Sequence, residues 1–387
     1  MKNERLFAAL SALDAEFNKD ALDWLISMYD AESGGMYYAA SSRDNDEFRP
    51  DIESTTQTLS LLQNLGLITT NENGIATDVP EWFAEGVRKF LKVRQDEGDG
   101  YFYDPVYRDI SPKSKKERNT NFAVDALKTL GTTPLYPTAT QRLSDTVNED
   151  DGDQAMYATK ESYLEWLDKN AEERGDSYHW GSDLSCARPM IIASGNLGTT
   201  VEWLKKRQNT QNGTWEDEFN MTAVNGVLKI RGYFNKNTEV YPHYDVYIRN
   251  TVEFTKTFEP EFAAYVWNPI GSVKRIVEAL PTAPEPELAR LIDDSAADMI
   301  ANTVVQMRGF RQPDGGFGYS RKGSSPRSNR VTVSLGLSEG DVNALALMAL
   351  VYVDAYALCK LQNSRVWANY RDYFWEQMKK KYDAVHI

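Results

Sequence analysis

Apolar residues recur at helical spacing in pairs of segments along most of the chain, and a polar stretch separates the two members of each pair. The first segment carries Lys, Arg and Glu between its apolar positions, whereas the second is dense in apolar and small residues. A helix with one apolar stripe faces solvent, and a helix that is apolar nearly all round is buried. The pattern therefore predicts that outer and inner helices alternate. The pairs are expected at residues 21–65, 85–130, 161–197, 199–234, 247–280 and 297–361, with a closing helix within 367–387.

Within these pairs, the first helix of the third is expected over residues 161–180, and the second helix of the second pair over 118–130. The alternation of apolar and polar residues that is typical of strands occurs only over short stretches. Residues 227–234 and 330–337 are the two segments that could form short strands. Tandem helix pairs build either an open solenoid or a closed toroid. Six unequal pairs with long loops between first and second helix favour closure. We expect an all-α protein, an (α/α)6 toroid (barrel) of about six helical hairpins with long inter-helix loops, as a single domain over residues 1–387.

A short clause, L-x3-Q-x4-G-x-aromatic, recurs where first helices end. One copy has Leu204, Gln208, Gly213 and Trp215, and the others are less regular. These are Leu91, Gln95, Gly100 and Phe102; Gln312, Gly315 and Phe317; and Leu25, Tyr29, Gly34 and Met36. At a helix end, Gln can hydrogen-bond free backbone groups, Gly permits a reversal and an aromatic ring can pack back between outer helices. The clause is therefore interpreted as a structural joint.

This clause resembles the QW motif of terpenoid cyclases and the related protein prenyltransferases, whose α/α toroids repeat such a clause at the end of each outer helix. The resemblance implies the toroid fold. The catalytic signatures of these families are missing: Asp-x-Asp-Asp does not occur, and NEDDGDQ at residues 148–154 has its carboxylates in another order. In the run Asp293, Asp294 and Asp298, the spacing before the last aspartate is one residue longer than in Asp-Asp-x-x-Asp. We expect this run on a solvated outer-helix face. The resemblance therefore implies no catalytic residue here.

Composition narrows the possible partners. The chain has 387 residues and a formal net charge of -14, which disfavours nucleic acid and anionic membranes as partners. No long apolar span and no signal-peptide pattern occurs, so a cytoplasmic location is expected. Two cysteines and three histidines offer too few sulfur and nitrogen ligands for a zinc site. We therefore predict no metal site and no cofactor. The expected partner is a small-molecule or oligosaccharide ligand.

Polar residues gather at the expected starts of the inner helices, which should converge on a central cavity. Helix capping explains some of them. Others lie within apolar helices, where a buried polar side chain needs a partner that a polar ligand could supply. Carboxylates or a histidine would perform acid–base chemistry. The candidate catalytic residues are Glu53, Asp51, Asp341 and His179. The candidate ligand-binding residues are Asn121, Arg188, Asn225, Asn343, Tyr103, Trp180 and Trp267.

Polar side chains and aromatic rings together are typical of a cleft that binds sugars. The leading hypothesis is a toroid that binds or processes a saccharide or similar polar ligand, possible activities being glycoside hydrolase, lyase or epimerase. A divergent enzyme similar to terpenoid cyclases or prenyltransferases is the second hypothesis. A non-catalytic binding scaffold is the third.

Overall fold

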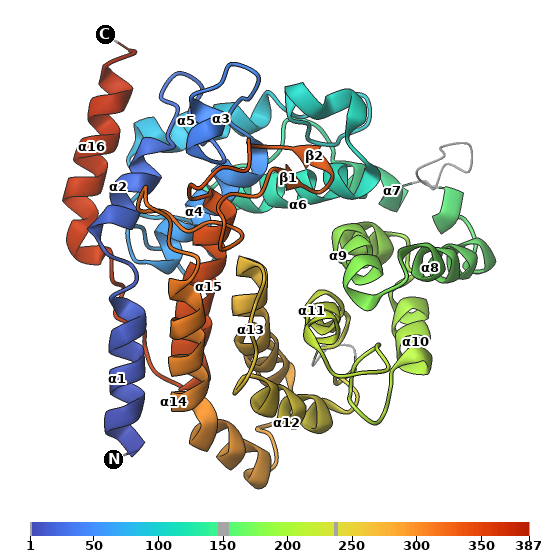
Figure 1. Cartoon of the computed structure of the whole chain (residues 1–387). Coiled ribbons are helices and arrows are strands. Elements are labelled where there is room, and N and C mark those ends of the chain that lie inside the picture. The colour runs from blue at the N-terminus through green and yellow to red at the C-terminus, as the bar shows by residue number, and fades with distance from the viewer. Residues whose placement is uncertain (1, 146–154, 236–238, 387) are drawn as a thin grey trace.

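The chain is predominantly helical, as the hydrophobic pattern predicts (Figure 1). The computed structural model describes residues 2–145, 155–235 and 239–386. Within these ranges the only sheet is a hairpin of two short strands, β1 (Arg327–Ser328) and β2 (Val331–Thr332). No described helix is both long and apolar enough to cross a membrane. The NEDDGDQ segment, residues 148–154, lies outside the described residues.

Helix pairs lie close to their expected positions along the described chain. The first helices are α2 (Lys19–Ser27), α5 (Glu81–Lys92), α8 (Lys160–Arg174), α10 (Leu197–Arg207), α12 (Tyr244–Phe254) and α14 (Pro286–Arg308). The second helices are α4 (Ile52–Asn64), α6 (Lys113–Thr129), α9 (Ser177–Ala193), α11 (Met221–Ile230), α13 (Ala263–Ala279) and α15 (Val342–Leu358). The other α-helices are α1 (Lys2–Asp14), α3 (Ala40–Arg43), α7 (Ala139–Asp145) and α16 (Arg371–Asp383). Short 3₁₀ turns are η1 (Pro105–Ile110), η2 (Ala155–Tyr157), η3 (Arg231–Tyr233) and η4 (Ala368–Tyr370).

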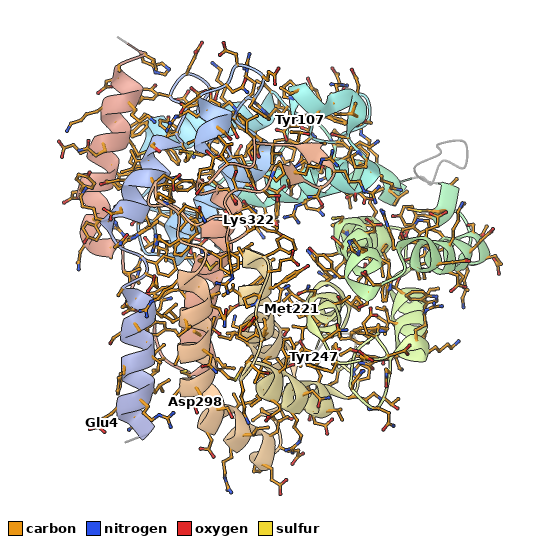
Figure 2. The ribbon with its side chains drawn as sticks, in the orientation of Figure 1. Glu4, Tyr107, Met221, Tyr247, Asp298 and Lys322 are labelled. Carbon is orange, nitrogen blue, oxygen red and sulfur yellow. The ribbon has the colours of Figure 1, made fainter. Side chains whose placement is uncertain are left out.

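The second helices pack against one another in a closed order. Helix α4 contacts α6, α6 contacts α9, α9 contacts α11, α11 contacts α13, α13 contacts α15, and α15 returns to α4. First helices pack on this group, as α5 does on α6, α8 on α9, α12 on α13 and α14 on α15. One such contact is a hydrogen bond of 2.6 Å between the hydroxyls of Tyr247 on α12 and Ser272 on α13 (Figure 2).

Helices α1 and α16 lie along one flank of the molecule, where α1 packs on α14 and α16 on α2 (Figure 1). Asp298 of α14 forms an ion pair with Arg5 of α1 (Figure 2). Asp293 lies 3.7 Å from Lys360, and the side chains of both Asp293 and Asp298 are about half exposed. The prediction that this acidic run is a solvated outer face is confirmed.

The repeated clause forms the same backbone reversal four times. Each copy closes with an isolated antiparallel bridge, the pairs being Tyr29 with Met36, Gln95 with Phe102, Asn209 with Thr214, and Arg311 with Phe317. Gln208 Nε2 donates to the carbonyl of Gly213 and to that of Pro242, both at 3.0 Å. Trp215 Nε1 donates to the carbonyl of Leu204 at 2.9 Å. The Gln thus ties the turn to the backbone just before the next hairpin.

In three of the four copies, the glycine of the clause lies directly against the next first helix. Gly213 has φ +72°, and a Cβ on it would come within 2.8 Å of the His243 carbonyl oxygen at the start of α12. Gly315, in the last copy, has φ +93° and would bring a Cβ within 3.0 Å of the Asp20 carbonyl oxygen in α2. The joint after the sixth pair therefore contacts the first pair, and three copies of the clause link neighbouring pairs, whereas the copy with Gly100 contacts the start of α7.

Several predicted boundaries are wrong. The sixth pair begins at Pro286 with α14, eleven residues before its expected start at residue 297. Residues 227–234 form the end of α11 and η3 rather than a strand, because they continue a helix that Asn220 caps. Helix α8 ends at Arg174, since Gly175 takes φ +79° and Asp176 caps α9 by accepting a hydrogen bond from the His179 amide. Helix α6 begins at Lys113, about one turn before the expected start, so that a basic run read as loop is helical.

Candidate functional site

A small polar cavity lies among the second helices. Each of these six helices contributes at least one residue to its wall: Glu53, Arg118, Tyr178, Lys229, Ala264 and Asn343. The cavity volume is about 160 Å³. We call it the central cavity. Its wall carries hydroxyl, amide and charged groups rather than a continuous apolar surface.

The loop between α14 and α15 forms one side of the central cavity. It contributes Tyr319, Ser325 and residues 327–329 of the β-hairpin. Asn329 and Arg330 turn the hairpin with φ of 45° and 72°, a conformation that Asn tolerates better than most residues. Ser328 Oγ donates to Glu53 Oε2 at 2.9 Å, which attaches the hairpin to α4. The hairpin is thereby held against the cavity.

Glu53 is the single carboxylate on the wall of the central cavity, within the residues that the structure describes. Its Oε1 accepts from Arg118 Nη2 at 2.6 Å, and its Oε2 accepts from Lys115 Nζ at 3.1 Å. Burial disfavours ionisation, but the charges of Arg118 and Lys115 outweigh it and hold the pKa of Glu53 well below its usual range. Glu53 is therefore suited to orient two cations and poorly suited to donate a proton near neutral pH.

Lys229 supplies a different chemistry to the same wall. Its Nζ lies 5.7 Å from the centre of the Tyr178 ring and forms no ion pair with any described carboxylate. Burial, reinforced by the charge of Arg118, lowers the pKa of Lys229 to about 8. Arg327 adds a third cation from the hairpin. The wall thus bears three cations and one carboxylate, an arrangement that favours an anionic group.

Two tyrosines line the central cavity. Tyr178 lies on the first turn of α9, and Tyr319 stacks on Phe262 with ring centroids 5.5 Å apart. Burial raises the pKa of both hydroxyls, so each remains protonated and can donate a hydrogen bond. Asn343 Oδ1 accepts from Gln57 Nε2 at 2.9 Å, which links α15 to α4 beside the cavity. These groups could bind the hydroxyls of a ligand.

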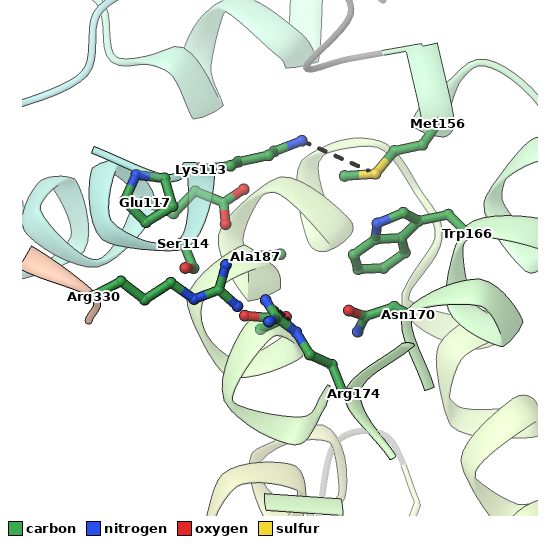
Figure 3. Close-up of a pocket in the computed structure, with 11 residues that line it drawn as sticks. Lys113, Ser114, Glu117, Met156, Trp166, Asn170, Arg174, Ala187 and Arg330 are labelled. Carbon is green, nitrogen blue, oxygen red and sulfur yellow. Dashed lines mark hydrogen bonds and ion pairs between the residues drawn. The ribbon is translucent and has the colours of Figure 1, made fainter. Parts of the chain in front are cut away.

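A second cavity of about 210 Å³ flanks the first across helices α6 and α9 (Figure 3). Glu117 and Asp183 line it, whereas their chain neighbours Arg118 and Ser182 line the central cavity. Figure 3 shows Trp166, Asn170 and Arg174 of α8 opposite Ser114, Glu117 and Arg330. Arg174 Nη2 lies 2.6 Å from Asp183 Oδ2. Burial raises the pKa of Asp183, although the charge of Arg174 acts to lower it. The hairpin tip, with Asn329 in one cavity and Arg330 in the other, separates the two.

Asp51 and Asp341 cap the second helices that they precede. Asp51 accepts from the Ser54 amide at 2.7 Å, and Asp341 accepts from the amides of Ala344 and Tyr319, both at 2.7 Å. Burial raises the pKa of each to about 7, and the charge of Asp104 adds to this effect at Asp51. Neither lines the central cavity as the structure describes it. Both carboxylates therefore accept hydrogen bonds from backbone amides at the starts of these helices.

The other predicted site residues are spread over the molecule. His179 is on the surface, with Nδ1 at 2.8 Å from Asp176 Oδ1. Asn121 and Arg188 line a separate pocket nearer the opposite ends of the second helices. Asn225 accepts from Asn268 Nδ2 at 2.6 Å in the interior. The aromatic candidates are packed elsewhere: Tyr103 donates to Asp99, Trp180 packs on Trp203 and Trp215, and Trp267 Nε1 donates to Asp354 at 2.7 Å.

The structure therefore brings two of the predicted residues, Glu53 and Asn343, into the central cavity. Sequence reasoning missed Arg118, although it was the first residue of the expected helix over 118–130, and it also missed Lys229. A lone lysine within the apolar run of α11 was an available signal for Lys229. No cluster of three His, Cys, Asp or Glu side chains that could hold a metal ion occurs in the described part of the chain.

Comparisons of the chain with protein-family models, curated proteins and solved structures found no match.

Proposed function

We propose that the chain is an (α/α)6 toroid that binds a small anionic ligand of the acidic saccharide class in its central cavity. The closed order of contacts among the second helices supports the toroid. So does the contribution of all six of these helices to one cavity wall, together with the approach of Gly315 to Asp20 between the sixth pair and the first.

The observation that carries the ligand proposal is the chemistry of the wall. Arg118, Lys229 and Arg327 face one carboxylate, and that carboxylate already accepts from two cations. Hydroxyl and amide groups of Tyr178, Tyr319 and the hairpin complete the lining. A uronate, a sugar with one carboxylate and several hydroxyls, offers the complementary groups. A prenyl chain gains its binding energy from apolar burial, which this small polar cavity supports less well.

The test is calorimetric titration with uronic acids and with the corresponding neutral sugars. We expect binding of the acidic members and at least roughly tenfold weaker binding of the neutral ones, which corresponds to about 1.4 kcal/mol. Lys229→Met should weaken uronate binding by a similar factor, whereas Lys205→Met, at an exposed position on α10, should not. Equal affinity for acidic and neutral sugars, or no binding of either, would contradict the proposal.

Lys229 also favours a second candidate function, a lyase or epimerase. A lysine whose pKa is lowered to about 8 is partly neutral at physiological pH and can accept a proton. In a bound uronate, the carbon beside the carboxylate carries an acidic hydrogen, which the neutral amine of Lys229 would take to become an ammonium. The electron pair of the broken C–H bond would pass into the carboxylate as an enediolate. Reprotonation on the opposite face would complete an epimerase reaction, and loss of the neighbouring oxygen substituent would complete a lyase reaction. Hydrolysis with two carboxylates across a glycosidic bond is less well supported, because Glu53 is the one carboxylate described on this wall.

Exchange of that carbon-bound hydrogen with deuterium from solvent separates catalysis from binding alone. We expect exchange that increases as pH rises through 8 and that is lost in Lys229→Met even at saturating ligand. Uronate binding without any exchange would instead identify a non-catalytic binding scaffold.

A further inference from the structure

A pocket near the carboxyl-terminal ends of α6, α9 and α11 collects positive charge. It has a volume of about 580 Å³ and is lined by Arg188, Lys229 and Arg231 together with Asn121, Ser185 and the carboxylate of Asp125. We call it the basic pocket. Lys229 also lines the central cavity, so the two sites share one side chain.

The cations of the basic pocket lack counter-charges. In the described part of the chain, neither Arg188 nor Arg231 forms an ion pair, and the Nε atoms of both are buried without a hydrogen-bond partner. The nearby carboxylate of Asp354 is occupied elsewhere: it accepts from Trp267 and lies 3.4 Å from both Lys274 and Arg275. Buried donors without partners are costly, which indicates that a ligand completes this site.

The three cations are also close enough to repel one another. Burial and the charge of Arg275, with a smaller contribution from Arg188, lower the pKa of Arg231 even though the charge of Asp354 opposes this shift. The guanidinium of Arg188 lies beside Gly232, with Nε 3.8 Å from the position that a Cβ would take. Asp125 is the one carboxylate in the lining, and burial raises its pKa, which weakens it as a counter-ion. The pocket therefore has an excess of positive charge in a protein of net charge -14.

We propose that the basic pocket binds a phosphate group, as free phosphate or as a phosphate monoester, between Arg188 and Arg231. A guanidinium offers paired N–H donors that match phosphate oxygens, and a dianion balances the excess charge better than a monoanion does. The pocket volume lies within the range of ligand sites and leaves room for an organic substituent. The phosphate proposal does not rest on the ligand proposed for the central cavity, although the two sites share the side chain of Lys229.

Thermal unfolding in increasing inorganic phosphate tests the proposal, with potassium chloride at matched ionic strength as the reference. A ligand that binds the folded state raises Tm progressively with its concentration. We expect this rise in the wild type and a loss of at least tenfold in apparent affinity in Arg188→Gln and in Arg231→Gln. Arg249→Gln, at a half-exposed site on α12, should keep the wild-type response.

A third pocket variant retains both arginines, so it separates a loss of phosphate binding from a loss of stability. Gly232 has no atom closer than 3.8 Å to its missing Cβ, and the nearest atoms belong to Arg188. Gly232→Asp should supply an internal carboxylate, abolish the response to phosphate and leave Tm in chloride unchanged or higher. The proposal is overturned if phosphate produces no more stabilisation than chloride, or if the response survives in all three pocket variants.

The source of the phosphate is resolved by a parallel titration with glycerol phosphate. Tighter binding than inorganic phosphate would identify an organic monoester as the ligand type, and equal binding would identify the free anion. A third titration uses malonate, a dicarboxylate. If malonate stabilises the protein as much as phosphate does, the assignment of the pocket to phosphate is overturned.

Discussion

Glu53 is a buried carboxylate that forms ion pairs with two cations of α6. Its carboxylate accepts from Lys115, which is 1% exposed, and from Arg118. Removing one partner of a buried ion pair leaves an uncompensated charge, which is far more costly than losing a surface pair. At the residue scale, the position of Glu53 is thus explained by the two cations beside it.

We expect Glu53→Gln to lower the free energy of unfolding by about 3–5 kcal/mol, because Lys115 and Arg118 lose their counter-charge. Chemical denaturation measures the change. Glu81→Gln, which removes an exposed partner of Arg88, should cost less than about 1 kcal/mol. Similar losses in the two variants would show that the Glu53 network contributes little.

Asp341 should make stability fall as pH rises. Its pKa, raised by burial to about 7, lies above the value of 3.8 expected in the unfolded chain, so between these values the folded state binds more protons. Stability therefore decreases between about pH 4 and 7 and levels off above. Denaturation curves across this range should show a shallower decrease in Asp341→Asn, with the remainder attributable to the other carboxyl groups whose pKa is raised by burial, which are those of Asp51, Asp104, Asp125 and Asp183. An unchanged slope would show that Asp341 does not titrate in this range.

At the scale of elements, the repeated clause is a joint in which Gln, Gly and an aromatic residue have separate structural tasks. Gln208 bonds two backbone carbonyls, Trp215 bonds a third, and Gly213 allows close contact with α12. These tasks follow from local chemistry, which is why the joint could be interpreted from the sequence. The identity of the backbone that Gln208 reaches, the carbonyl of Pro242, could not be predicted, because it depends on the packing of the next pair.

Gly213→Ala should destabilise the protein more than Gly195→Ala does. Both glycines have φ between +70° and +80°, so both substitutions cost roughly 1 kcal/mol of backbone strain. A Cβ at Gly213 would also clash with the His243 carbonyl, whereas nothing lies within 4 Å at Gly195. Denaturation should reveal an extra loss of about 1–3 kcal/mol at Gly213. Equal losses would indicate that the joint relaxes freely.

At the scale of the whole molecule, the last joint meets the first pair. Asp314 Oδ2 accepts from Trp24 Nε1 in α2 and from the Gly340 amide before α15, both at 2.9 Å. In an open helical array each repeat contacts only its neighbours, so the first and last pairs unfold separately. A closed arrangement instead couples them.

Hydrogen exchange can test this coupling. We expect Asp314→Ala to speed amide exchange in α2 and α15 together, because one carboxylate holds both. Asn209→Ala, at the joint between α10 and α11, should speed exchange near that joint and leave α2 protected. Faster exchange confined to α15 in Asp314→Ala would argue for an open array.

The sequence by itself determined the helix pairs, their order and their joints, because these follow from hydrophobic periodicity and from the chemistry of Gly, Gln and Asn at helix ends. Only the tertiary structure decided which polar residues share a cavity. Helix α9 begins at Ser177, earlier than expected, and Tyr178 on its first turn lines the central cavity. Helix α6 also begins earlier than expected, at Lys113, so the basic segment that it includes is helical. Lys229 and Arg188 come from different pairs, and they meet in one pocket because α9 packs on α11. Such contacts join residues far apart in sequence, which local patterns do not specify.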